Sequence, residues 1–107
     1  MALTIDNFTR IMGGAGNRNI YICDIDFDTS YPTGGEALAP ATVGMQSFDL
    51  VMVAPDAGYV FEFDYTNNLL LAYWADNDAG SDTALVQVAD TTNLSGVANA
   101  RALIIGV

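Results

Sequence analysis

Acidic side chains are the most frequent ionisable groups in the chain, and two sets of them alternate along the sequence. Asp24, Asp26 and Asp28 are spaced by two residues, as are Glu62 and Asp64. Paired carboxyl groups could serve glycoside hydrolysis, but the same spacing places each set on one face of a strand, where carboxylates solvate a sheet. Because the chain has no histidine and no lysine, the commonest general base and the Schiff-base amine are missing. We therefore expect no enzymatic activity, and a small hydrolase is the least favoured alternative.

A third acidic set lies in a turn that contains glycine. Asp76, Asp78 and Asp82 occupy positions 1, 3 and 7 of the segment Asp-Asn-Asp-Ala-Gly-Ser-Asp. Oxygen ligands at alternate positions of a tight loop suit Ca²⁺. The glycine stands at position 5 rather than 6, and position 12 is Gln87 instead of the bidentate glutamate of an EF-hand. The sequence favours an ordinary acidic turn, with a calcium site as the alternative, and predicts no cofactor.

The charge balance narrows the choice of partners. Thirteen acidic residues stand against three arginines, which gives a formal net charge of −10. Binding to nucleic acid requires clustered cations, and an anionic bilayer would repel this surface. The glycine-rich segment at residues 13–16 has no lysine to hold a phosphate and is interpreted as a plain loop. We expect neither nucleic acid nor membrane as a partner, and association through apolar contacts or with a basic surface.

Cysteine usage and apolar run length bear on the compartment. Cys23 is the only cysteine, so no internal disulfide is possible, and a small buried hydrophobe is the expected role. The first residues do not combine a basic region with an apolar one, as a secretory signal would. The apolar runs are much shorter than the ~20 residues that span a bilayer. We expect assembly in a cytoplasm.

The aromatic residues concentrate in residues 59–74 and have two possible uses. They could form a platform on which sugar rings stack, or they could fill the core. Core packing is the favoured use for most of them, and the exposure of Trp74 distinguishes the two. The set is Tyr59, Phe61, Phe63, Tyr65, Tyr73 and Trp74.

Alternation of apolar and polar residues recurs at short intervals, and helical periodicity is nearly absent. The clearest example is residues 19–28, where Tyr21, Cys23 and Ile25 point one way and the aspartates the other. Pro40 followed by Gly44 predicts a single helical turn within the long loop at residues 29–44. The predicted strands are residues 3–11, 19–28, 45–53, 59–65, 69–75, 85–88 and 101–107.

The strongest local signal is a hairpin between residues 59–65 and 69–75. Asparagine tolerates positive φ, so Asn67 and Asn68 predict a two-residue type I′ turn. That turn would pair Tyr65 with Leu70, Phe63 with Ala72, and Phe61 with Trp74. About seven short strands without a linker or an internal repeat predict one all-β domain over residues 1–107. Its expected form is an antiparallel β-sandwich or a small β-barrel with at most one short helical turn.

One segment resembles a known family. Residues 31–38 read Tyr-Pro-Thr-Gly-Gly-Glu-Ala-Leu, and residues 26–38, Pro40 and residues 57–68 extend the similarity. Together they resemble small virion structural proteins of tailed bacteriophages, a likeness that runs from about residue 18 to residue 88. The resemblance implies a capsid decoration, or cement, protein that binds the major capsid protein on the outside of the shell. It brings no catalytic motif with it.

The expected function is therefore non-enzymatic stabilisation of a phage head, on the virion surface after assembly in the host cytoplasm. We expect a small symmetric homo-oligomer, either a dimer or a trimer. The alternative is a host-recognition or glycan-binding module on a tail or head fibre. Loops on a rigid scaffold commonly carry binding, so the loop at residues 29–44 is the first candidate for the capsid contact, with a loop that merely covers the core as an equal alternative. Its predicted contact residues are Tyr31, Pro32, Leu38, Pro40, Val43 and Met45.

Overall fold

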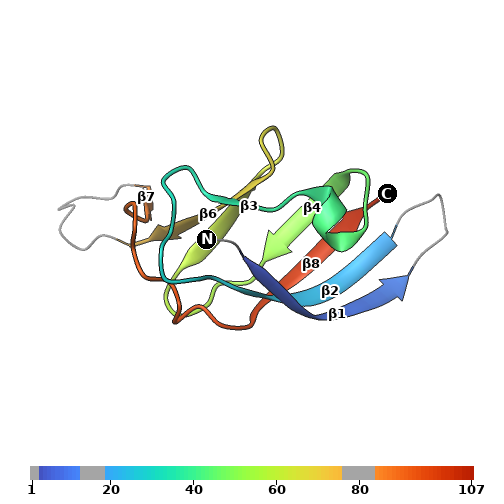
Figure 1. Ribbon diagram of the computed structural model, residues 1–107, viewed down its shortest axis with the longest axis horizontal. Helices are drawn as coiled ribbons and strands as arrows, with labels where there is room; N and C mark the ends of the chain where they lie inside the picture. Colours follow the sequence, from blue (N-terminus) through green and yellow to red (C-terminus); the bar gives the residue numbers. More distant parts are fainter. Residues whose placement is uncertain (1–2, 13–18, 76–83) are drawn as a thin grey trace.

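The computed structural model describes residues 3–12, 19–75 and 84–107, which form two antiparallel sheets (Figure 1). The first sheet has the order β1-β2-β8-β4, with bounds Thr4–Met12, Asn19–Asp26, Ala100–Gly106 and Phe48–Val53. The second has the order β3-β6-β5, with bounds Glu36–Ala37, Leu69–Trp74 and Val60–Asp64. Strand β7, Val86–Gln87, pairs with the end of β6. The prediction of an all-β sandwich is confirmed.

Alternation along the strands builds the core between the two sheets. In the first sheet Cys23, Ile25 and Ile104 point inward and are fully buried. Phe63 and Leu70 face them from the second sheet, and Phe63 makes an edge contact with Phe48 at 5.4 Å between ring centroids. The connecting segments also contribute to this core, through Tyr31, Leu38, Val43, Met45, Leu94 and Val97.

The predicted helical turn is present as the 3₁₀ helix η2, Pro40–Val43. Proline at its start supplies a preset φ, and Gly44 ends it in the left-handed conformation at φ 75°. The N–H of Met45 donates to the carbonyl of Pro40 at 2.9 Å and ties the turn to the start of the next segment. Pro40 therefore begins the helical turn and Gly44 ends it, as the sequence predicts.

The predicted hairpin is present, but its predicted register is wrong by two residues. Phe63 pairs with Leu70, and Phe61 pairs with Ala72, across a four-residue loop. Asp64 closes this loop early: its Oδ1 accepts from the N–H of Thr66 at 2.9 Å, and its Oδ2 accepts from Asn67 Nδ2 at 2.9 Å. A shift of two residues preserves the face of every side chain. The aromatic residues therefore keep their predicted side of the sheet.

Candidate interaction surfaces

Six apolar side chains share the face of the first sheet that points away from the core. The register places Ile20 beside Ile105, and Ile105 beside Leu50. Two residues along each strand, a second row joins β2, β8 and β4 in the same way. We call this surface the outer apolar face; its members are Ile20, Ile22, Leu50, Met52, Leu103 and Ile105.

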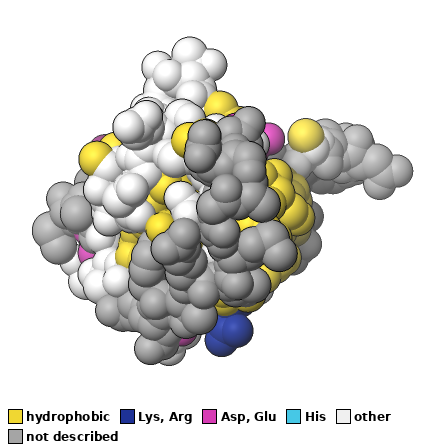
Figure 2. Space-filling model, turned by 90° about the vertical axis from the view of Figure 1, so that its right-hand side faces the viewer, with side chains coloured by type: hydrophobic (Ala, Val, Ile, Leu, Met, Phe, Trp, Pro, Cys, Tyr) yellow, Lys and Arg dark blue, Asp and Glu magenta, His cyan; other side chains and the backbone are white. Residues whose placement is uncertain are grey.

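The outer apolar face departs from the usual pattern of a solvated sheet, in which outward positions are polar. Met52 is 57% exposed, and the other five members are half-buried. A hollow of about 370 Å³ lies along Ile22, Met52 and Leu103. Figure 2 shows hydrophobic side chains gathered on one side of this end of the molecule, with a basic side chain at their lower border. Contiguous apolar surface of this kind marks interaction sites.

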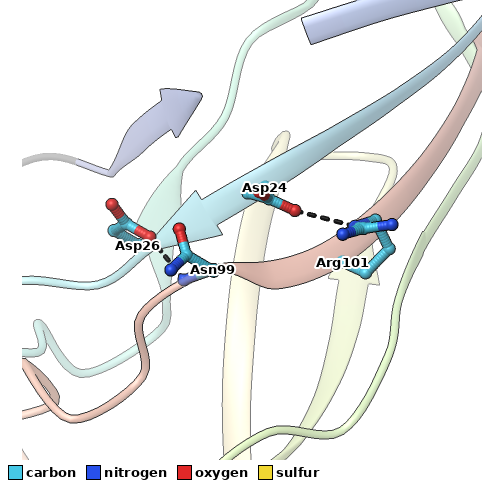
Figure 3. A network of polar contacts seen from close by, with 4 residues as sticks. All are labelled: Asp24, Asp26, Asn99 and Arg101. Carbon is cyan, nitrogen blue, oxygen red and sulfur yellow. Dashed lines mark hydrogen bonds and ion pairs between the residues drawn. The ribbon is translucent and has the colours of Figure 1, made fainter. Parts of the chain in front are cut away.

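Polar contacts between β2 and β8 border this face (Figure 3). Arg101 Nε donates to Asp24 Oδ1 at 2.8 Å, and Asp26 Oδ1 accepts from the N–H of Asn99 at 2.5 Å. Asp24 is only 4% exposed, so the expectation of three solvated aspartates on β2 is wrong for this residue. Asp24 can be buried because the guanidinium of Arg101 contacts its carboxylate and neutralises the charge.

A second apolar surface lies at the other end of the molecule, where β7 is seen at the left of Figure 1. We call it the β6–β7 end and define it by Tyr59, Trp74, Leu85 and Val86. Trp74 is 43% exposed, and Leu85 and Val86 are similarly exposed. Tyr59, Trp74 and Val86 line a hollow of about 300 Å³, with Gln87 and Thr92 as its polar members.

The seam between β4 and β5 forms a further groove of about 390 Å³. The Tyr65 hydroxyl accepts from the backbone N–H of Val51 at 3.0 Å, which occupies a donor on the free edge of β4. Tyr65 also packs edge-on against Phe63 at 5.0 Å. A free strand edge invites pairing with another chain, so this phenol protects the edge at its centre.

The structure buries most of the predicted capsid contacts in residues 29–44. Tyr31, Leu38, Val43 and Met45 are core residues, whereas Pro32 and Pro40 are half-buried. The four buried side chains cannot touch a shell subunit in this conformation. The sequence leaves open whether this loop binds a partner or covers the core, and in the structure its apolar residues close the space between the two sheets.

The motif at residues 31–38 positions core groups. The Tyr31 hydroxyl accepts from the N–H of Ala72 at 3.2 Å and from Gln87 Nε2 at 2.9 Å. The carbonyl of Pro32 accepts from the N–H of Gly35 at 3.0 Å, closing a turn in which two glycines have positive φ. This turn directs the chain into β3, which pairs with β6, and it places the next residue, Glu36, in the core. The role of these residues in the fold is structural.

Two carboxyl groups near this turn are unusual. Asp28 Oδ2 and Glu36 Oε2 are buried without a hydrogen-bond partner in the part of the chain that the structure describes, and Glu36 is 1% exposed. Burial raises the pKa of Glu36, and the charge of Asp28 raises it further. A neutral Glu36 carboxyl avoids the cost of an unpaired buried charge. Glu36 was not among the residues predicted to be functional, and the one sequence signal for its burial is its place in a run of apolar or turn-forming residues.

Three further segments were considered from the sequence: Cys23, the candidate calcium turn and the glycine-rich segment. Cys23 is buried, and burial together with Asp24 raises its pKa to about 11, so the thiolate is scarce at neutral pH. The candidate calcium turn, with Asp76, Asp78 and Asp82, lies outside the described residues, as does the glycine-rich segment at 13–16. Within the described ranges, no three acidic, histidine or cysteine side chains gather as a metal site.

No protein-family model, curated protein or solved structure matches this chain. Across residues 3–12, 19–75 and 84–107, no helix has the length and apolar character needed to cross a membrane.

Proposed function

We propose that this protein is a non-enzymatic decoration protein of a bacteriophage head, which binds the outside of the major capsid shell and stabilises it. The motif at residues 31–38 supports the proposal through its resemblance to small virion structural proteins. The observation that carries it is the presence of two separate apolar surfaces on one small domain. A protein that cements a shell must make two contacts at once, one with a shell subunit and one with a further molecule on the shell, and each apolar surface provides one of them.

The β6–β7 end is the proposed contact with the shell. Trp74 projects there beside Val86 and Tyr59 around a hollow that a shell side chain can fill. Exposed aromatic residues beside a hollow are frequent binding hot spots, and truncating one commonly costs about 2 kcal/mol or more. The net charge of −10 adds attraction for a shell surface that carries basic residues.

The test is co-sedimentation of the purified chain with expanded shells that lack decoration. Saturable binding at a stoichiometry that matches a capsid symmetry position is expected. Trp74→Ser combined with Val86→Thr should weaken binding by about 30-fold or more. Val60→Thr is the control for Val86→Thr, because both valines are 39% exposed and Val60 does not line the hollow that Trp74 and Val86 share. Absence of binding by the unmodified chain refutes the proposal.

A glycan-binding function is the second candidate, and the hollow beside Trp74 favours it. Sugar rings stack on exposed aromatic faces, and Gln87 and Thr92 add polar groups to the same hollow. Trp74 is the only tryptophan in the chain, so its fluorescence reports directly on this site. Saturable quenching by a glycan, abolished by Gln87→Ala with the fold intact, would support this function over shell binding.

A further inference from the structure

The outer apolar face has a self-complementary layout. Strand β8 lies between β2 and β4, and each of them places two apolar residues beside Leu103 and Ile105. Because these side chains alternate with the buried Ala102 and Ile104, they point to the opposite side from the core. Beyond β2 the sheet continues into β1, in which Thr9 pairs with Ile22 and Met12 with Ile20. No described strand of the second sheet pairs with a strand of the first.

The distribution of charge limits what can cover this face. The chain carries −10 overall, yet none of the six members of the outer apolar face is charged. Two acidic side chains lie at its border: Asp24 is neutralised by Arg101 at 2.8 Å, and Asp26 accepts from the N–H of Asn99. Two copies can therefore meet here without desolvating unpaired carboxylates or bringing like charges together within the contact. A strongly basic partner would gain little from this uncharged surface.

We propose that the outer apolar face binds the same face of a second copy, about a two-fold axis that places β8 against β8. In such an isologous contact each surface meets its own equivalent, and a central strand flanked by similar neighbours satisfies this directly. The packed sheets would be separated by about 10 Å. Pairing through the free edge of β4 is disfavoured, because the Tyr65 hydroxyl already occupies the N–H of Val51.

The area of the outer apolar face determines how tightly two copies are expected to bind. Three strands and about five residues along each give roughly 200–300 Å² of apolar centre. A stable dimer contact usually covers about 800 Å² on each partner. The six side chains therefore form the centre of a larger contact, and dissociation is expected at low protein concentration. This inference goes beyond the proposed function, since it concerns the isolated chain and does not require a shell.

The test is sedimentation equilibrium of the isolated chain over a range of protein concentrations. We expect a monomer–dimer equilibrium that strengthens when salt rises from about 0.01 M to about 1 M, because screening relieves repulsion between acidic copies. Met52→Glu places a carboxylate in the contact and should raise the dissociation constant by at least about tenfold. Val60→Glu adds the same charge to the other sheet at an exposed apolar residue and should dimerise nearly as well as the unmodified chain.

Circular dichroism establishes that each variant is folded. Leu103→Thr is the second variant: it introduces a β-branched residue, which strands favour, adds no charge, and should also weaken association. A chain that is monomeric throughout, a trimer, or a dimer unaffected by Met52→Glu and Leu103→Thr would each overturn the inference. A dimer that weakens with salt would overturn it as well. Shell binding is measured separately through Trp74 and Val86, so failure of one proposal is distinguishable from failure of the other.

Discussion

At the scale of single residues, the buried Glu36 and the half-buried Asp28 present the sharpest energetic problem. Each has a carboxyl oxygen that is buried without a partner among the described residues. A proton retained on Glu36 removes one of the two charges, in keeping with the raised pKa of this group. Glu36→Gln makes that neutral state permanent and keeps nearly the same shape. We expect the variant to be more stable than the unmodified chain above neutral pH, by about 1–3 kcal/mol.

The pH dependence follows from the sign of the shift. Because folding raises the pKa of Glu36, the stabilising proton is fully bound below the unfolded value of about 4.3. Its contribution is lost as pH rises through the folded value. Urea unfolding across pH should show the advantage of Glu36→Gln growing with pH and vanishing in acid. Glu62→Gln, at an exposed position, is the control. Equal pH profiles for both variants would contradict the account.

Tyr31 and Tyr65 offer a matched comparison of buried and exposed hydroxyl groups. Tyr31→Phe leaves the N–H of Ala72 and the amide of Gln87 without their acceptor at a site that is 1% exposed. Tyr65→Phe frees only the N–H of Val51, beside a phenol that water reaches. We expect a loss of about 2–3 kcal/mol for Tyr31→Phe and under about 1 kcal/mol for Tyr65→Phe by urea unfolding. The reverse order would argue that Tyr31 has another partner.

The burial of Tyr31 also shows where sequence reasoning about single residues stops. Its ring is held by hydrogen bonds to residues 41 and 56 positions away, and its backbone pairs with Thr92. No sequence pattern within residues 29–44 predicts these partners of Tyr31. Prolines and glycines correctly predicted an irregular backbone. They did not predict exposure, because an irregular segment that is anchored at several points can line a core.

At the scale of elements, the turn that precedes β3 depends on two adjacent glycines with different surroundings. Gly34 has φ 97° with open space around it, whereas a Cβ on Gly35, at φ 108°, would lie 2.9 Å from the carbonyl oxygen of Leu70. Gly34→Ala should therefore cost only backbone strain, about 1–2 kcal/mol. Gly35→Ala adds a clash with the backbone of β6, for about 2–5 kcal/mol in all. Thermal unfolding of both variants checks the order, and equal losses would mean that β3 moves away at no cost.

The strands show how much of the fold the sequence predicts. Seven were expected from alternation, and each is present with its bounds shifted by a few residues at most. Strand β3 was not expected, because two residues have no periodicity and Glu36–Ala37 forms a strand only by pairing with Leu69 and Leu70. The hairpin register was wrong because Asp64 closes the loop with its side chain. Local pattern predicts that strands exist, whereas side-chain contacts decide where they end.

At the scale of the whole molecule, the outer apolar face was not identified from the sequence. In β2, apolar residues occur at consecutive positions, with Ile20 and Ile22 on one side and Tyr21 and Cys23 on the other. Such a run is compatible with either side facing the core. Only the register with β8 and β4 shows that the isoleucines join a continuous apolar surface. A surface made of three strands distant in sequence becomes visible only after they pair.

The net charge of −10 acts on the molecule as a whole, and we expect salt to stabilise the fold because of it. Where ion pairs dominate, salt has the opposite effect, because it weakens their attraction. With thirteen acids and three arginines, repulsion outweighs attraction in the folded state. Raising NaCl from about 0.01 M to about 1 M shortens the screening length from ~30 Å to ~3 Å. The midpoint of urea unfolding should therefore rise with salt, although screening weakens the Arg101–Asp24 pair.

Dimerisation would produce a similar rise, because any process that favours the folded chain stabilises it. The two causes separate in Met52→Glu, which weakens association at least about tenfold but keeps the surplus of negative charge. If screening acts within each molecule, the midpoint of this variant still rises with salt and does not depend on protein concentration. A midpoint that falls with salt in Met52→Glu would contradict the prediction, since attraction between charges would then exceed repulsion in the folded chain.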